Sequence, residues 1–145
     1  AQGKETAGEE EMLHALKTAL SDFVKNLPQG LETKVAQGGT NFSGGQKQRL
    51  CIARALMKKT GLYVFDDSFS ALDFKTDKAL REALKEETKE AAVLIIAQRI
   101  STILHASQIV VLDEGRIADV GNHEYLMEHC SVYRDIARSQ MKGEE

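Results

Sequence analysis

Two short apolar runs separated by one amphipathic segment constrain the fold of this chain most strongly. The runs are residues 62–65 and residues 92–97, and residues 74–89 between them carry apolar side chains at helical spacing. Strand, helix and strand in this order predict a crossover connection and a parallel sheet, with strands buried on both faces. The expected fold class is therefore α/β.

Two further helices are expected before the first strand. Apolar residues recur at helical spacing from Glu9 to Leu27, and Pro28 follows directly as a stop signal. Ser43, with Gln46 three positions later, has the pattern of a capping box at the start of a second helix, which should run to about residue 58. The connection between these helices, residues 31–42, is expected to be irregular.

A hairpin and two short helices are expected to close the chain. Apolar residues flank the turn signal at 113–115, which predicts two antiparallel strands. Residues 122–141 contain two short helical patterns, and residues 1–8 are expected to form a frayed end or a loop. The chain should thus divide into a helical subdomain, residues 1–58, and the C-terminal part of an α/β core, residues 59–145.

Composition excludes several classes of function. The net charge of −3 offers no basic surface for nucleic acid, and 42% hydrophobic with 28% charged residues is typical of a soluble globular chain. The longest apolar run, residues 91–97, is too short to span a bilayer, so any membrane part should lie outside this chain. Cys51 and Cys130 lie in apolar helical patterns without metal-ligand spacing, which predicts two reduced, packed thiols in a cytosolic compartment.

The sharpest local pattern is the string FSGGQKQR at residues 42–49. It places Gly44 and Gly45 in the first turn of a capped helix, where backbone N–H groups and the positive end of the helix dipole attract anions. The Ser43 hydroxyl could donate a hydrogen bond to a phosphate oxygen. Taken alone, the string is explained equally well by a plain helix start with a glycine-rich lead-in.

Polar residues follow both predicted strands. Asp66 and Asp67 end the first strand, and Gln98 follows the second. Ligand sites of parallel sheets lie at the carboxyl ends of the strands. There Asp66 would hold Mg²⁺ through water, Asp67 would face an attacking water, and Gln98 would be placed as a γ-phosphate sensor.

The ordered set FSGGQ, LYVFDD, SALD and AQR resembles the ABC ATPase family, and residues 9–140 follow the pattern of exporter nucleotide-binding domains. The resemblance implies a P-loop NTPase-like partial domain that uses ATP and Mg²⁺. It assigns Asp66 to the Walker B aspartate, Asp67 to the catalytic glutamate position and Gln98 to the switch-histidine position. The signature that caps ATP across a dimer would be Ser43, Gly44, Gly45 and Gln46, and the D-loop would be Ser70, Ala71, Leu72 and Asp73.

One expected element of this family is absent from the sequence. A Walker A loop requires G-x-x-x-x-G-K-[ST], and the one Gly-Lys pair, Gly3-Lys4, lacks both the earlier glycine and the Ser or Thr. We therefore expect the P-loop and the Q-loop to lie upstream of residue 1. Without the backbone cradle for the β- and γ-phosphates, this chain alone should not hydrolyse ATP.

Two residues depart from the family pattern at the same site. An aspartate at position 67 draws the carboxylate back by ~1.5 Å relative to glutamate, and an error of that size costs catalysis about 100-fold. Gln98 can donate a hydrogen bond to phosphate but carries no charge, unlike histidine. Each could be a tolerated variant. Together they resemble one subunit of a heterodimeric exporter, whose own Walker site is degenerate and whose signature serves the partner.

The resemblance implies the ATPase part of an exporter at the cytoplasmic face of a membrane, working with transmembrane domains and a second nucleotide-binding domain. A chromosome-maintenance ATPase of the same superfamily would need a long coiled coil before the signature, and no heptads occur between Glu9 and Gly39. A non-catalytic regulatory or interaction module stays open as an alternative. Strands left as edges without the P-loop part would also favour self-association of the chain.

Overall fold

The computed structural model describes residues 8–141, which form two compact units. The first unit ends at Ile96, and the second begins at Ala97. Residues 1–7 lie outside the described residues. The expected frayed end or loop at residues 1–8 therefore falls outside them except at Gly8, and so does the Gly3-Lys4 pair. The predicted boundary after residue 58 falls inside the first unit, between a helix and a strand, and stays a prediction.

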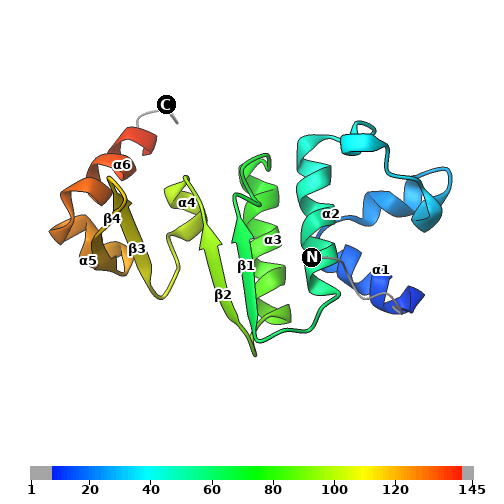
Figure 1. Ribbon diagram of the computed structural model, residues 1–145, viewed down its shortest axis with the longest axis horizontal. Helices are drawn as coiled ribbons and strands as arrows, with labels where there is room; N and C mark the ends of the chain where they lie inside the picture. Colours follow the sequence, from blue (N-terminus) through cyan, green and yellow to red (C-terminus); the bar gives the residue numbers. More distant parts are fainter. Residues whose placement is uncertain (1–7, 142–145) are drawn as a thin grey trace. The chain divides into compact units, whose positions relative to one another are not determined.

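The first unit combines helices with one pair of parallel strands (Figure 1). Its elements are α1 (Glu9–Thr18), the 3-10 helices η1 (Asp22–Asn26), η2 (Gly30–Glu32) and η3 (Gln37–Gly39), α2 (Gly44–Leu56), β1 (Leu62–Asp66), α3 (Phe74–Glu87) and β2 (Ala92–Ile96). β1 and β2 pair in parallel from Leu62 with Ala92 to Asp66 with Ile96, as the sequence predicts.

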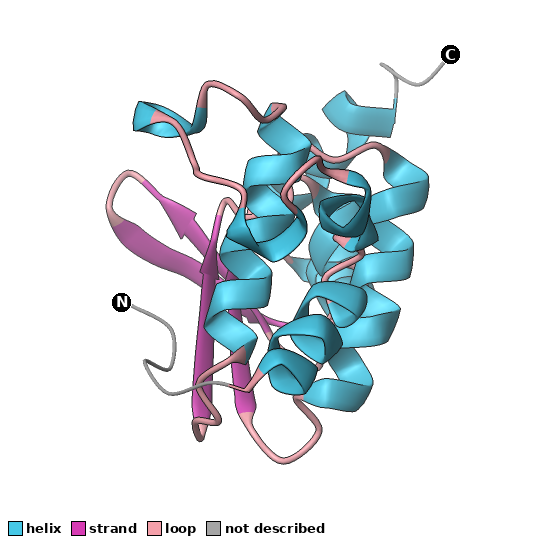
Figure 2. Ribbon diagram, turned by 90° about the vertical axis from the view of Figure 1, so that its right-hand side faces the viewer, coloured by secondary structure: helices cyan, strands magenta, loops and turns pink. Residues whose placement is uncertain are grey.

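One face of the β1–β2 sheet carries the core of the first unit. Tyr63 and Phe65 point into it and are 7% and 2% exposed, and the Phe65 ring meets the Phe69 ring edge-on at 5.8 Å. Helices of this unit lie on one side of these strands (Figure 2). Buried side chains of α1, α2 and α3 complete the cluster, among them Leu16, Ile52, Leu56, Leu80 and Leu84.

The opposite face of the sheet is open, so the prediction of strands buried on both faces is wrong for the described residues. Alternation along the strands turns Leu62, Val64, Leu94 and Ile96 away from the core, and each is 50–53% exposed. The apolar run predicts a strand correctly, but a run that is apolar throughout does not reveal which face has a covering layer.

The prediction of a single helix from Glu9 to Leu27 is wrong. The structure ends α1 at Thr18 and begins the 3-10 helix η1 at Asp22, with a break at Leu20 between them. Leu20 adopts a left-handed conformation with φ of 51°. Its N–H donates to Lys17 O at 3.0 Å, and the N–H of Ser21 donates to Leu16 O at 2.7 Å. This pair of bonds is the Schellman ending of a helix, which usually carries glycine at the left-handed position.

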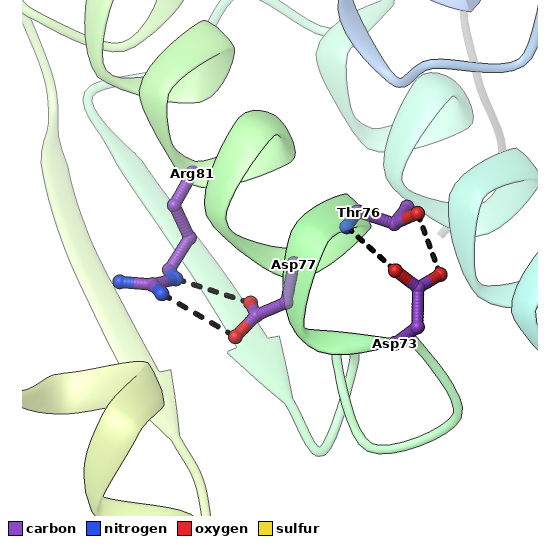
Figure 3. A network of polar contacts seen from close by, with 4 residues as sticks. All are labelled: Asp73, Thr76, Asp77 and Arg81. Atoms are coloured by element: carbon purple, nitrogen blue, oxygen red, sulfur yellow. Dashed lines mark hydrogen bonds and ion pairs between the residues drawn. The ribbon is translucent and has the colours of Figure 1, made fainter.

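Two aspartates, Asp73 and Asp77, make polar contacts in the first turns of α3 (Figure 3). Asp73 caps the helix, since its Oδ1 accepts from Thr76 N at 3.0 Å. One turn later, Asp77 is buried, and its Oδ1 accepts from Arg81 Nε at 3.0 Å across an i,i+4 spacing. The Asp77–Arg81 pair is the one buried ion pair found between side chains of residues 8–141.

The second unit contains the predicted hairpin and the predicted closing helices. Its elements are α4 (Ile100–Ile103), β3 (Ile109–Asp113), β4 (Arg116–Gly121), α5 (His123–His129) and α6 (Ser131–Met141). β3 and β4 pair antiparallel around Glu114 and Gly115, both with positive φ. Leu126 and Tyr133 are buried against β3. The short helix α4 is not foreseen from the sequence, because one turn leaves too little periodicity to detect.

Both cysteines are free, but only Cys130 is packed in the interior. Cys51 is exposed on α2, so the prediction of two packed thiols is half wrong. Across residues 8–141, every helix is either too short or too polar to cross a bilayer.

Candidate functional site

The N-terminal turn of α2 is held by a reciprocal cap. Ser43 Oγ accepts from Gln46 N at 3.2 Å, and Gln46 Oε1 accepts from Ser43 N at 2.9 Å, which confirms the predicted capping box. The first-turn amides of Gly44 and Gly45 have no acceptor within the helix. The turn therefore presents backbone donors, with the positive end of a 13-residue helix behind them.

The loop after β1 packs directly against this turn. A Cβ placed on Gly44 would lie 3.3 Å from Ala71 Cβ, and one placed on Gly45 would lie 3.1 Å from Ala71 O. Glycine at both positions lets the loop and the helix approach this closely, since a side chain at either would force a neighbour to move by a few tenths of an ångström. Ala71 and Leu72 thus lie beside the first turn of α2 in the first unit.

A shallow concavity of about 360 Å³ opens over this contact. It is lined by Ser43, Gly44, Gly45, Arg49, Ala71, Leu72, Asp73 and Thr76. The Arg49 guanidinium lies 5.4 Å from the centre of the Phe23 ring, and its buried Nε has no hydrogen-bond partner among the described residues. Arg49 and the helix terminus together bring positive charge to the concavity. Arg49 and Thr76 are lining residues that sequence reasoning did not assign.

Asp73 brings the negative charge of the concavity. The Thr76 hydroxyl donates to Asp73 Oδ2 at 2.7 Å, and this bond, together with the Thr76 amide, holds the pKa of the Asp73 carboxyl below its ordinary value (Figure 3). The carboxylate therefore stabilises the fold above that ordinary pKa, and this contribution is lost as the pH falls through the lowered value. Near neutral pH, Asp73 is a fixed anion that caps α3.

Asp66 and Asp67 lie at the carboxyl end of the parallel pair, where the sequence places them. Asp67 N donates to Ile96 O at 2.9 Å, which continues the ladder by one residue, and the Asp67 backbone then turns with φ of 48°. The Asp67 carboxylate accepts from Ser70 Oγ at 3.0 Å. The side chain of Asp66 is exposed.

Gln48 joins α2 to the loop that contains Asp67. Its Nε2 donates to Asp67 O at 3.0 Å and to Ser70 Oγ at 2.9 Å, and its Oε1 accepts from Ala71 N at 2.9 Å. No role could be assigned to Gln48 from the sequence, because its partners lie 19–23 positions away along the chain. A polar side chain inside an amphipathic helix was the only available signal.

Gln98 lies in the second unit, in the segment between β2 and α4. Its backbone oxygen accepts from Gln140 Nε2 at 2.7 Å, and Gln140 Oε1 accepts from Ile100 N at 2.8 Å. Helix α6 therefore holds the backbone on both sides of Arg99. The Gln98 side chain is exposed.

The residues of the first unit fit a phosphate group and a magnesium ion. Backbone donors at a long helix N-terminus and a serine hydroxyl suit phosphate oxygens. Mg²⁺ keeps several waters and is commonly held by one or two carboxylates plus phosphate, and the exposed Asp66 at a strand end would supply one such carboxylate. No group of three or more His, Cys, Asp or Glu side chains within residues 8–141 forms a metal cage.

Comparison with known proteins agrees with this geometry. Residues 2–70 match the family model described as ABC transporter. The chain is 47% identical over 133 residues to an ABC transporter ATP-binding protein of Mycobacterium tuberculosis, covering 91% of this chain and 22% of that protein. It is 41% identical to an ATP-dependent lipid A-core flippase of Haemophilus influenzae, covering 92% of this chain and 23% of the flippase.

A solved structure gives the same result in three dimensions. A bacterial Atm1-family ABC exporter with ATP bound superposes with a TM-score of 0.91 at 36% identity, covering 96% of this chain and 25% of that one. The chain thus spans between a fifth and a quarter of the proteins it matches. On its sequence, its fold and these relatives, the chain belongs to the ABC transporter family and has the ABC-type ATPase fold.

Proposed function

We propose that this chain is the signature-bearing part of an ATPase domain in an ABC exporter. The observation that carries the proposal is the capped N-terminal turn of α2, packed on Ala71 and open to the concavity beside it. Such a turn binds phosphate and supplies no nucleophile of its own. The resemblance to exporter ATPases implies that this turn completes a nucleotide site whose other half comes from a second nucleotide-binding domain.

Each site residue has a separate role in this proposal. Ser43, Gly44, Gly45 and Gln46 would contact the ATP phosphates bound by the partner domain, with the segment from Ser70 to Asp73 behind them. Asp66 would hold Mg²⁺ through water, and Asp67 and Gln98 would face the γ-phosphate of this chain's own nucleotide. ATP with Mg²⁺ supplies the phosphoryl group, whose transfer depends on positioning and charge stabilisation.

Asp67 and Gln98 give this chain a weak site of its own, which is why we infer a heterodimer. The Asp67 carboxylate is already bonded to Ser70 Oγ within its own loop, and it is one methylene shorter than glutamate. A shorter carboxylate held by its own loop is poorly placed to orient water. The intact signature turn would then serve the stronger site of the partner.

The proposed setting is the cytoplasmic face of a membrane, where the transmembrane domains of the same transporter would couple nucleotide binding to transport. Relatives named as a lipid A-core flippase and a putative multidrug export protein of Staphylococcus aureus support an exporter. Self-association of the isolated chain through strands left as edges remains part of this proposal, and the exposed apolar side chains on the open face of the β1–β2 sheet also favour it.

Replacing Asp66 by asparagine in the complete protein tests whether this chain takes part in nucleotide chemistry. For the purified chain, residues 1–145, we expect no release of phosphate from ATP. For the complete protein, we expect Asp66→Asn to weaken Mg²⁺-dependent nucleotide binding at this chain's site, and a fluorescent ATP analogue measures this binding. Steady phosphate release from the purified chain that Asp66→Ala abolishes would contradict the proposal. Unchanged nucleotide binding in Asp66→Asn would favour a regulatory module instead.

Replacing Asp67 by alanine tests the heterodimer. We expect Asp67→Ala to lower ATP turnover of the complete dimer by no more than about threefold, because the carboxylate is short and locally bonded. Loss of the partner's catalytic glutamate should stop turnover. Single-turnover hydrolysis of radiolabelled ATP measures both variants side by side. If Asp67→Ala halts turnover as completely as the partner variant does, the two sites are equivalent and the idea is wrong.

A further inference from the structure

The loop from Asp67 to Leu72 touches both functional regions of the first unit. At its start, Asp67 directly follows β1, next to the proposed magnesium ligand Asp66. At its other end, Ala71 lies against Gly45, with 3.1 Å between Ala71 O and a Cβ placed on that glycine. The two regions would serve different nucleotides, because the signature faces the partner's ATP. A rigid loop would therefore link the two sites.

Gln48 is the side chain of α2 that fixes this loop. A glutamine amide has two N–H donors and a carbonyl oxygen that accepts, and in Gln48 both donors and the oxygen form hydrogen bonds. The donors reach Asp67 O and Ser70 Oγ, and the acceptor takes the amide of Ala71. Since a backbone N–H can only donate, the bond to Ala71 N fixes which end of the amide is oxygen.

Ser70 extends the contact to the Asp67 carboxylate. The Ser70 hydroxyl accepts from Gln48 and donates towards Asp67 Oδ2 at 3.0 Å and Asp67 O at 3.1 Å. A continuous set of hydrogen bonds thus runs from α2 through Gln48 and Ser70 to the carboxylate. Hydrogen bonds in such a chain reinforce one another, so removing the first member loosens the others.

We propose that Gln48 is a positioning residue that locks the Asp67–Leu72 loop to the signature helix, so that the chain's two half-sites move as one body. The inference rests on the proposed function, since it assumes that both half-sites bind nucleotide. Gln48 touches neither nucleotide in this arrangement. It acts through the backbone of Asp67 and Ala71 and through the Ser70 hydroxyl.

Gln48→Met in the complete transporter tests the inference, because methionine keeps the length of the side chain and removes all three hydrogen bonds. We expect kcat for ATP to fall about tenfold while KM changes by less than about twofold, because losing the bond to Ala71 N also frees the part of the loop that packs on the first turn of α2. Gln48→Glu, which keeps the acceptor for Ala71 N and loses both donors, should also lower kcat. Gln29→Met, at an exposed loop glutamine, is the matched control and should leave kcat unchanged.

A double-mutant cycle with Ser70→Ala separates positioning from a general loss of structure. If Gln48 acts through the loop, the double variant should lose little more kcat than the worse single variant. Effects that multiply, or a wild-type kcat in Gln48→Met, would overturn the inference. Hydrogen exchange of peptides spanning residues 44–56 should stay unchanged in Gln48→Met, since an unfolded α2 would lower kcat for another reason.

The two proposals fail in different ways. If Asp66→Asn binds nucleotide at this chain's site as tightly as wild type does, the proposed function is wrong, whatever Gln48 does. If Asp66→Asn weakens that binding while Gln48→Met and Gln48→Glu keep wild-type kcat and KM, only the inference about Gln48 is wrong.

Discussion

Gly45→Ala is expected to lower ATP turnover of the complete transporter about 100-fold. The new methyl group would lie 3.4 Å from Leu72 Cδ2 and 3.1 Å from Ala71 O, and the contact with this backbone oxygen is tighter than most that a Cβ makes. Either the first turn of α2 or the loop must move by a few tenths of an ångström. Both movements misplace the backbone donors that we assign to the partner's ATP, and the measurement is steady-state phosphate release.

Gly61→Ala is the matched control for this substitution. Gly61 lies between α2 and β1, and no heavy atom beyond its chain neighbours lies within 4 Å of a Cβ built there. We expect its turnover to match wild type. Turnover of Gly45→Ala within about twofold of wild type would show that the close contact with Ala71 has no role in catalysis.

Arg81→Met is expected to lower the local stability of α3 by about 3 kcal/mol. The substitution leaves the Asp77 carboxylate, whose side chain is 2% exposed, buried without its cationic partner. A buried charge without a partner costs more than the pair contributes, which is why removing one member destabilises strongly. Hydrogen exchange of peptides from residues 74–88 in the complete protein measures the free energy of opening.

Two further variants separate the ion pair from the loss of a surface charge. Lys78→Met removes the same charge from an exposed position of α3 and should change the free energy of opening by less than about 0.5 kcal/mol. Asp77→Leu combined with Arg81→Met removes both charges and should recover part of the loss. An Arg81→Met variant as stable as Lys78→Met would mean that water reaches Asp77.

Local patterns in the sequence predicted local structure well. The Ser43–Gln46 capping box and the β3–β4 hairpin depend on residues a few positions apart, so their spacing is visible in the chain. The ordered motifs also led to the family, which the comparisons confirm. The break of α1 was missed because leucine, not glycine, takes the left-handed position at residue 20.

Contacts between distant segments were not visible in the sequence. Gln48 has three partners in a loop about twenty positions away, and nothing in its neighbours along the chain indicates this. The burial of β1 depends on which layers are present and not on its own residues. The roles that we propose for Asp66 and for the first turn of α2 are still predictions, since they concern contacts with ATP, with Mg²⁺ and with a second nucleotide-binding domain.

Four apolar side chains on the open face of β1 and β2 make the free energy of unfolding of this chain depend on what covers that face. Leu62, Val64, Leu94 and Ile96 are each about half exposed, and fully burying such a side chain contributes about 1 kcal/mol more. Covering the whole face would thus add a few kcal/mol, comparable with the net stability of many domains. By mass action, a melting temperature measured on this chain should rise with protein concentration, or with any polypeptide that binds the folded form at this face.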